Sequence, residues 1–278
     1  MTKCVITAAG KGTRLLPFTK ELPKEMMPIF VNNKNQKKVV PLVQLIFEQM
    51  YENGLREYCF IVGREKRSIE DHFTPDNAYL KDLEEKNKKL ISNFYKKIEK
   101  SHLSWVNQHK PLGFGDAVRR AEKFVGDDDF IVHAGDAAIV GKDSHPIKKF
   151  LDYLKNNKKT DCIFLCKEVQ DNRRFGVPEV EKISSSIYKV LNVEEKPTKP
   201  KSNLAILPIY YFKPSIFNHL KKIKPGKGGE YQLTDAIKNM VKSGQTVLAL
   251  RMDSSKKDLD VGTVESFKES LDISFKLR

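Results

Sequence analysis

Short apolar runs alternate with amphipathic stretches along most of the chain. The runs that predict buried strands occupy residues 4–9, 58–62, 103–106, 129–134 and 160–166. Between them, apolar positions at helical spacing and glycine or capping signals predict helices at residues 41–53, 68–73 and 144–154, and a glycine turn that opens a helix at residues 111–118. Because strands and helices alternate, we expect an α/β fold with a largely parallel sheet and helices on both faces.

The pattern changes after residue 173. Strand-like runs at residues 175–177, 187–193 and 204–212 follow one another with little helix between them, which predicts an antiparallel addition to the sheet. A helix, a strand and a closing helix complete the pattern, at residues 234–241, 246–251 and 263–275. No linker or internal repeat divides the chain, so we expect a single domain.

Two helical stretches carry further expectations. We expect Ser68 to be the N-cap of the helix at residues 68–73. Residues 78–100 are rich in lysine and amphipathic, which fits a lid or a subunit contact. The more ordinary interpretation is a helix packed on the core, with its lysines in water.

The charge balance favours anionic partners. The 278 residues include 50 Lys+Arg and 36 Asp+Glu, and the net charge is +14. Such an excess attracts polyanions or phosphorylated small molecules. The lysines are scattered, and no zinc-finger, RNA-recognition or basic-region pattern occurs, so we expect no nucleic-acid partner.

Cysteine and hydropathy patterns exclude several other classes. Cys4, Cys59, Cys162 and Cys166 form no C-x-x-C pair, which argues against zinc and thioredoxin-type chemistry, and we expect buried thiols. There is no run of about eighteen apolar residues and no signal-peptide layout. We therefore expect a cytoplasmic protein without a membrane partner.

A glycine loop follows the first predicted strand. Gly10 and Gly12 permit a tight turn and a close approach of backbone N–H groups, and the cations Arg14 and Lys24 come soon after. Leu15 stands where a Walker loop and a dinucleotide fingerprint both need glycine, so neither applies. The loop is either a phosphate-binding site or a plain turn with solvated cations.

Charged residues mark two further loops. Asp136 follows a buried strand and Asp260 lies between two elements, and carboxylates at such positions suit Mg²⁺ as well as they suit an ordinary turn. At residues 194–197, a glutamate could accept hydrogen bonds from hydroxyl groups while Lys196 meets a phosphate. The alternative there is a charged turn.

Nine motifs in order give these features a common meaning. They are AAGKGTR (8–14), PKEMMP (23–28), GFGDAV (113–118), GD (135–136), FGV (175–177), EEKP (194–197), SNLAI (202–206), GEYQLTDAI (229–237) and DVG (260–262). From residue 3 to about 270, the chain resembles the sugar-1-phosphate nucleotidylyltransferases, and more narrowly the prokaryotic UTP–glucose-1-phosphate uridylyltransferases.

The resemblance implies a Rossmann-like three-layer α/β/α nucleotidyltransferase fold, with a mostly parallel central sheet and an added antiparallel sugar-binding part. The single domain would have a nucleotide-binding part over residues 1–140, a sugar-binding part over 141–262 and a C-terminal helix over 263–278. It implies a Mg²⁺-dependent transfer of a uridylyl group from UTP to glucose 1-phosphate, which gives UDP-glucose and pyrophosphate. It also implies a homo-oligomer, either a dimer or a tetramer.

Site residues follow by motif position. The resemblance implies that the nucleotide is bound by Ala8, Ala9, Gly10, Gly12, Thr13, Arg14, Gln108 and Gly113. It implies that the sugar phosphate is bound by Gly176, Glu195 and Lys196, and that the metal is bound by Asp136 and Asp260. The catalytic residues that it implies are Arg14, Lys24 and Lys196.

Two alternatives remain open. Lys11 departs from the apolar residue often found in the uridylyltransferases, and Gly135 before Asp136 is also common in the thymidylyltransferases. A glucose-1-phosphate thymidylyltransferase, or an enzyme with a broad range of sugar phosphates, is therefore the near alternative. A non-catalytic nucleotide-sugar-binding subunit on the same fold is the distant one, and it predicts eroded metal ligands.

Overall fold

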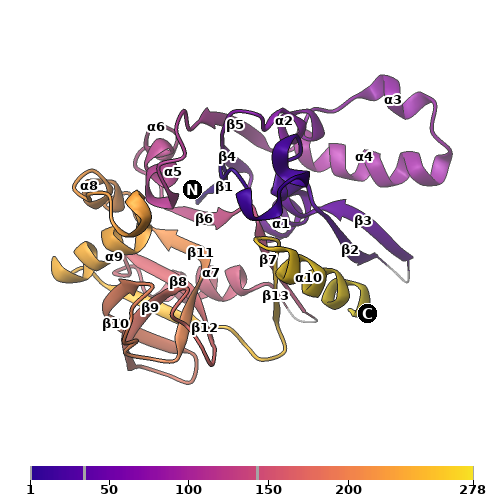
Figure 1. The fold of residues 1–278 in the computed structure, drawn as a ribbon. Helices are drawn as coiled ribbons and strands as arrows, with labels where there is room; N and C mark the ends of the chain where they lie inside the picture. The colour runs from indigo at the N-terminus through magenta and orange to yellow at the C-terminus, as the bar shows by residue number, and fades with distance from the viewer. Residues whose placement is uncertain (1, 34–35, 142–143, 278) are drawn as a thin grey trace.

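The computed structural model describes residues 2–33, 36–141 and 144–277, and a nine-stranded sheet forms its centre (Figure 1). The strand order is β5-β4-β1-β6-β11-β8-β12-β10-β9. The bounds are β1 Lys3–Ala8, β4 Glu57–Val62, β5 His102–Asn107, β6 Phe130–Ala134, β8 Cys162–Glu168, β9 Gly176–Lys182, β10 Ile187–Glu195, β11 Leu204–Phe212 and β12 Val247–Arg251.

The sheet is mixed. Strands β5, β4, β1 and β6 are parallel to one another, and so are β8 and β12. Strand β11 is antiparallel to both β6 and β8, and β10 is antiparallel to both β12 and β9. The predicted α/β class and the antiparallel addition after residue 173 are confirmed. However, β11 lies between the two parallel groups, so the addition is partly inside the sheet.

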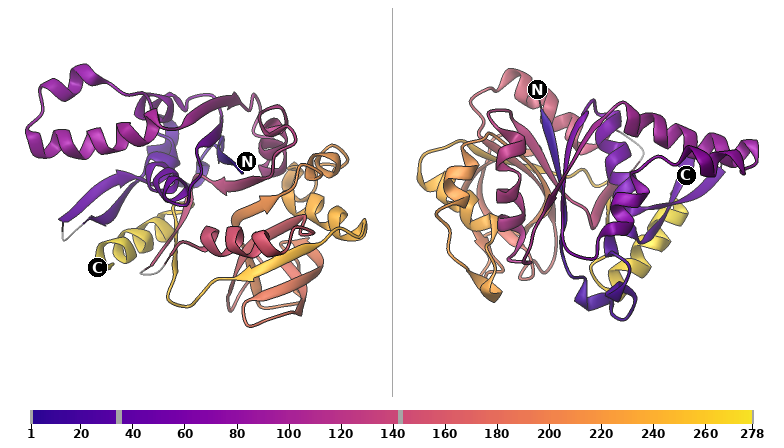
Figure 2. Two further views of the ribbon diagram at one scale, coloured as in Figure 1. Left: turned by 180° about the vertical axis from the view of Figure 1, so that it is seen from behind. Right: turned by 90° about the horizontal axis from the view of Figure 1, so that it is seen from above.

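Helices cover both faces of the sheet (Figure 2). On one face lie α1 Leu42–Glu52, α2 Arg67–His72, α4 Glu85–Glu99 and α7 Pro146–Asn156. On the other lie α5 Phe114–Arg120, α6 Glu122–Val125, α8 Ile216–Leu220 and α9 Leu233–Lys242. Along β1, Cys4 and Ile6 pack on the first group and Val5 on the second, as the alternation of strand side chains requires. The predicted three layers are confirmed.

Two small sheets were not predicted. Strands β2 Pro28–Asn33 and β3 Gln36–Pro41 form a hairpin, and β7 Ala137–Val140 pairs with β13 Lys257–Asp260. The second sheet joins distant parts of the chain, which a local pattern does not reveal. The C-terminal helix α10 Val264–Lys276 follows it, begins with a capping box at Thr263 and packs beside β2 and β13 (Figure 1).

Three helix details differ from the sequence-based expectation. Ser68 does not cap α2, because the helix begins one residue earlier and Lys66 occupies the N-cap. His145 caps α7 by accepting a hydrogen bond from the Ile147 backbone nitrogen. Residues 78–100 contain two helices, α3 Asn77–Lys81 and α4, which extend from the body next to β5 (Figure 2).

The packing of this helical arm is limited. Phe94 and Ile98 of α4 are buried, and Tyr79 of α3 is exposed. The C-terminal half of α4 is thus packed on the core, while the lid or subunit-contact interpretation stays a prediction. All four cysteines are buried, as expected. No helix in the described ranges is long and apolar enough to cross a lipid bilayer.

Candidate active site

The glycine loop begins at the carboxyl end of β1. Gly12 has a φ of 67°, which favours glycine, and its carbonyl oxygen accepts a hydrogen bond from Thr19 Oγ1 at 2.8 Å. A short 3₁₀ turn, η1 Thr13–Leu15, follows and carries the predicted residues Thr13 and Arg14. A Cβ atom at Gly10 would lie 3.5 Å from Lys24 Nζ. The loop backbone and the Lys24 ammonium group therefore meet at one place.

Lys24 forms an ion pair with Asp136. Lys24 is the first residue of the 3₁₀ turn η3 Lys24–Met26, and Asp136 lies in the two-residue turn between β6 and β7. Lys24 Nζ donates a hydrogen bond to Asp136 Oδ2. Burial raises the pKa of Asp136, but the charge and hydrogen bond of Lys24 outweigh it and hold that pKa below its usual range. Burial lowers the pKa of Lys24, but Asp136 outweighs it and raises the pKa above its ordinary value. Both groups are charged at neutral pH.

The small β7–β13 sheet places Asp260 at the same spot. Asp260 pairs in register with Ala137, and the backbone nitrogen of Val261 donates to the Asp136 carbonyl oxygen at 3.1 Å. Burial raises the pKa of Asp260, and the negative charge of Asp136 raises it further. The negative charges of the two carboxylates therefore repel each other, and a divalent cation held by both would relieve that repulsion.

This donor set fits a magnesium ion. Among the residues that the structure describes, no group of three or more His, Cys, Asp or Glu side chains could enclose a metal. Mg²⁺ is commonly held by one or two carboxylates, with substrate phosphates and water completing the shell. The two aspartates suit an ion that arrives with a phosphorylated substrate better than a permanent structural metal.

A second group surrounds Gln108, which follows β5 and is buried. Its Nε2 donates to Asp116 Oδ2 at 2.8 Å and to the Gly113 carbonyl oxygen at 3.3 Å. Burial raises the pKa of Asp116, but hydrogen bonds from Gln108 and Arg119 lower it below its usual value. Because both contacts use the amide nitrogen, they fix the orientation of the Gln108 side-chain amide.

Gly113 lets residues 230–231 pack closely against the turn beside Gln108. Its φ is 108°, and a Cβ atom there would lie 2.8 Å from Glu230 Cβ and 2.9 Å from the Tyr231 carbonyl oxygen. The segment around residues 230–231 thus packs directly on this turn, and the backbone nitrogen of Tyr231 donates to Leu112 at 2.8 Å. Any larger residue at position 113 would separate the two segments.

A third group comes from the antiparallel part. Gly176 of β9 lies opposite Glu195 of β10, and Thr234 Oγ1 donates to Glu195 Oε2 at 3.1 Å. A Cβ atom at Gly176 would lie 2.7 Å from Thr234 Cγ2. Lys196 has a φ of 45°, and its Nζ lies 3.5 Å from Glu195 Oε1. The structure therefore brings the three predicted sugar-phosphate residues together, with Thr234 as an additional member.

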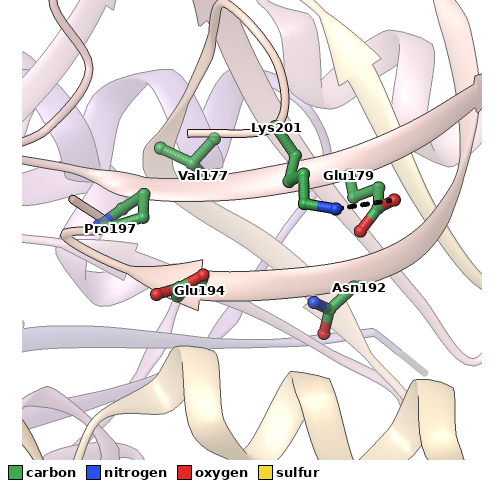
Figure 3. A pocket seen from close by; sticks show the side chains of 6 residues that line it. All are labelled: Val177, Glu179, Asn192, Glu194, Pro197 and Lys201. Carbon is green, nitrogen blue, oxygen red and sulfur yellow. Dashed lines mark ion pairs between the residues drawn. The ribbon is translucent and has the colours of Figure 1, made fainter. Parts of the chain in front are cut away.

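A small hollow lies on the face of β10 that carries Glu194. Glu194 points away from Glu195, since neighbouring side chains on a strand face opposite sides. The volume of this hollow is about 10 Å³. Figure 3 shows the residues that line it, which are Val177, Glu179, Asn192, Glu194, Pro197 and Lys201. Lys201 Nζ and Glu179 Oε1 lie 3.9 Å apart at its rim. A space of this size holds about one water molecule, so it is not a substrate site.

One pair of site residues escaped the sequence analysis. Lys66 Nζ donates to Glu25 Oε2 at 2.9 Å, and both side chains are buried directly behind Lys24. Glu25 stands within the PKEMMP motif, and Lys66 follows the carboxyl end of β4. Their positions, in a motif and after a strand, mark both residues as candidates for the site. However, nothing in the sequence indicates that they contact each other.

Comparison with known proteins identifies the family of this chain. The family model for nucleotidyl transferases matches residues 3–273. A UTP–glucose-1-phosphate uridylyltransferase of Mycoplasma pneumoniae is 38% identical over 95% of this chain and 89% of that protein. One from Bacillus subtilis is 37% identical over 86% of this chain and 80% of its own length.

Solved structures give the same result. A UDP-glucose pyrophosphorylase in complex with UDP-glucose has a TM-score of 0.86 and 31% identity, and each chain is covered completely. A second UDP-glucose pyrophosphorylase, without ligand, has a TM-score of 0.88, 30% identity and 99% coverage of both chains. The chain therefore belongs to the nucleotidyl transferase family. Within that family it groups with the UTP–glucose-1-phosphate uridylyltransferases, also called UDP-glucose pyrophosphorylases.

Proposed function

We propose that this protein transfers a uridylyl group from UTP to glucose 1-phosphate and releases pyrophosphate. The observation that carries the proposal is the partly buried Lys24–Asp136 pair, which lies beside the Gly10 backbone and interacts electrostatically with Asp260. The proteins similar to this chain in sequence are named UTP–glucose-1-phosphate uridylyltransferase, and those similar in structure are named UDP-glucose pyrophosphorylase.

The substrate sites are assigned as follows. The backbone from Ala8 to Gly10 and the group of Gln108 and Gly113 receive the nucleoside, while Gly12, Thr13 and Arg14 hold the triphosphate. Gly176, Glu195 and Lys196 hold the sugar phosphate. Residues 1–140 thus bind the nucleotide and residues 141–262 the sugar, with Asp260 reaching from the second part into the first.

The chemistry needs no covalent enzyme intermediate. The phosphate oxygen of glucose 1-phosphate is a nucleophile at neutral pH, and it attacks the α-phosphorus of UTP in line with the leaving pyrophosphate. Lys196 orients the sugar phosphate, and Glu195, fixed by Thr234, is placed to accept hydrogen bonds from sugar hydroxyls. Arg14 and Lys24 stabilise the charge that moves onto the leaving group.

Asp136 and Asp260 would hold the divalent cation that nucleotidyltransferases generally use, and we propose Mg²⁺. When bound, this ion supplies neutralisation of phosphate charge. Lys24 contacts Asp136. A phosphate that enters the site offers Lys24 a second anionic partner, while Asp136 keeps an oxygen atom for the cation.

Product analysis tests the proposal directly. Pyrophosphate release is measured with glucose 1-phosphate, Mg²⁺ and one of UTP, dTTP, CTP, ATP or GTP. A clear preference for UTP supports uridylyl transfer, and a preference for dTTP would assign the thymidylyltransferase alternative with the same mechanism. No turnover, together with binding of labelled UDP-glucose, would leave a non-catalytic subunit; intact Asp136, Asp260, Arg14 and Lys24 argue against that result.

Three wider properties belong to the same proposal. We place the protein in the cytoplasm, where UTP is available, and cell fractionation tests this. We propose a dimer or tetramer, which light scattering measures. We expect no nucleic-acid partner; steeply salt-dependent binding to DNA or RNA would contradict that expectation.

A further inference from the structure

A buried ion pair lies behind the Lys24–Asp136 contact. The side chains of Lys66 and Glu25 are 8% and 1% exposed, and Lys66 Nζ lies 2.9 Å from Glu25 Oε2. Burial raises the pKa of Glu25, and the positive charges of Lys66 and Lys24 act against that rise. Removing two charges from water costs several kcal/mol per ion, so such a pair is weak evidence for stability alone.

The pair connects the ends of three parallel strands. Lys66 follows β4, and Glu25 belongs to η3, next to Lys24 in the chain. A Cβ atom at Gly135 would lie 3.1 Å from Glu25 Cγ, so the Glu25 side chain packs against the backbone that leads from β6 into Asp136. A Cβ atom at Gly63 would lie 3.1 Å from the Ala9 carbonyl oxygen, which places the loop before Lys66 on the end of β1.

The four charges alternate in sign along a connected path. Lys66 contacts Glu25, Glu25 is the chain neighbour of Lys24, and Lys24 contacts Asp136. The charge of Lys66 also helps to lower the pKa of Asp136, after the larger effect of Lys24. We call Glu25 and Lys66 the inner pair and Lys24 and Asp136 the outer pair. The inner pair acts on both members of the outer pair through packing and through its electrostatic field.

We propose that Glu25 and Lys66 are positioning residues, which hold the Lys24 ammonium group and the Asp136 carboxylate in the arrangement required for phosphate binding and transfer. This inference rests on the proposed function of the site. In this role they do not touch the substrate themselves and act through the Lys24–Asp136 pair. Groups that orient the ligands of a site commonly contribute 10- to 100-fold to affinity or activity.

Paired substitutions separate this role from a structural one. Glu25→Gln and Lys66→Met are made singly and together, and Asp161→Asn with Lys213→Met serves as the control pair. Asp161 and Lys213 form an ion pair at 3.3 Å, at the end of the sheet opposite to the carboxyl ends of β1, β4 and β6. Each single substitution at the inner pair leaves one buried charge uncompensated, so we expect lower urea midpoints.

The double variant removes both charges, and its urea midpoint is expected to recover. Its kcat is expected to stay about 10- to 100-fold below that of the native protein. Its affinity for UTP, measured by calorimetry in EDTA, should fall about tenfold. The control pair should leave kcat and UTP affinity unchanged.

A Lys24→Met background completes the experiment. Lys24→Met breaks the Lys24–Asp136 pair through which Glu25 and Lys66 act. Removing Glu25 and Lys66 in that background should therefore reduce kcat and UTP affinity little further, whereas independent effects would add. Recovery of kcat and UTP affinity together with stability in the double variant would overturn the inference. If the native protein binds UTP but forms no UDP-glucose, the proposed function fails, and the calorimetric comparison still decides the role of the pair. A native protein that binds no UTP would overturn both.

Discussion

The backbone nitrogen of Val261 donates a hydrogen bond to the Asp136 carbonyl oxygen at 3.1 Å. This contact ties the strand that carries Asp260 to the loop that carries Asp136, two aspartates far apart in the sequence. Together with the β7–β13 pairing, it sets the two carboxylates close enough for the charge of one to raise the pKa of the other. The candidate metal site is thus built by a small sheet outside the main one.

Replacing either carboxylate should stop catalysis without unfolding the protein. We expect Asp136→Asn to lower kcat about 100- to 1000-fold, the range seen when one preorganised electrostatic group is lost. Circular dichroism and a thermal scan check the fold, and Mg²⁺ titration of turnover checks the site. Near-native turnover in Asp136→Asn would remove this residue from the metal site.

Lys196 is expected to act on the sugar phosphate. Lys196→Ala removes a charge-assisted hydrogen bond, so the KM for glucose 1-phosphate should rise about tenfold or more. The KM for UTP should change much less, because the nucleotide is assigned to other residues. Steady-state kinetics with each substrate varied in turn measures both constants, and an effect confined to UTP would reverse the assignment.

The contact between Gly176 and Thr234 allows a rescue experiment. A Cβ atom at Gly176 would lie only 2.7 Å from Thr234 Cγ2, so Gly176→Ala should displace Thr234 and loosen its hydrogen bond to Glu195. We expect a higher KM for glucose 1-phosphate. Thr234→Ser removes the obstructing methyl group and keeps the hydroxyl, so the double variant should recover. Failure of that recovery would show that the glycine serves another purpose.

Two histidines predict a loss of stability in acid: His133, which is buried, and His145, which is partly buried. Burial lowers the pKa of His133 to about 4 and that of His145 to about 3, and neither Nε2 has a hydrogen-bond partner among the described residues. The unfolded chain, with histidine pKa values near 6.5, then binds more protons than the folded one between pH 6.5 and about 4. Stability is fully present above pH 6.5 and falls as the pH drops through this window.

Urea midpoints at pH 7.5, 6.0 and 5.0 measure this effect. Each histidine contributes up to about 1.4 kcal/mol per pH unit inside the window. His133→Phe should flatten the pH dependence, because it removes one of the two protonation sites. A slope equal to that of the native protein would show that His133 takes no part.

The sequence was sufficient to place several candidate site residues at the ends of parallel strands. Ala8 is the last residue of β1, and Gly10, Gln108 and Asp136 come one or two residues after β1, β5 and β6, whose carboxyl ends meet at one edge of the sheet. The alternation of apolar runs was sufficient to predict these strands and most of the helices. Motif order then gave the residues of the antiparallel part, which strand direction alone does not place.

What the sequence did not reveal depends on contacts between distant segments. The β7–β13 pairing joins residues 137–140 to residues 257–260, and the second strand carries lysine and aspartate where a strand pattern expects apolar residues. The Glu25–Lys66 pair likewise has no local signature, because a buried charge looks like a solvated one in sequence. The N-cap prediction at Ser68 was wrong in the same region. Lys66, which contacts Glu25, occupies the N-cap of α2.

The most direct test of uridylyl transfer at this site is the reverse reaction. Glucose 1-phosphate release is measured from UDP-glucose and from dTDP-glucose, each with pyrophosphate and Mg²⁺, in the native protein and in Asp136→Asn. We predict rapid release from UDP-glucose, slower release from dTDP-glucose and almost none from either in the variant. Equal or faster release from dTDP-glucose would contradict the uridylyl assignment, and unchanged release in Asp136→Asn would contradict the location of the site.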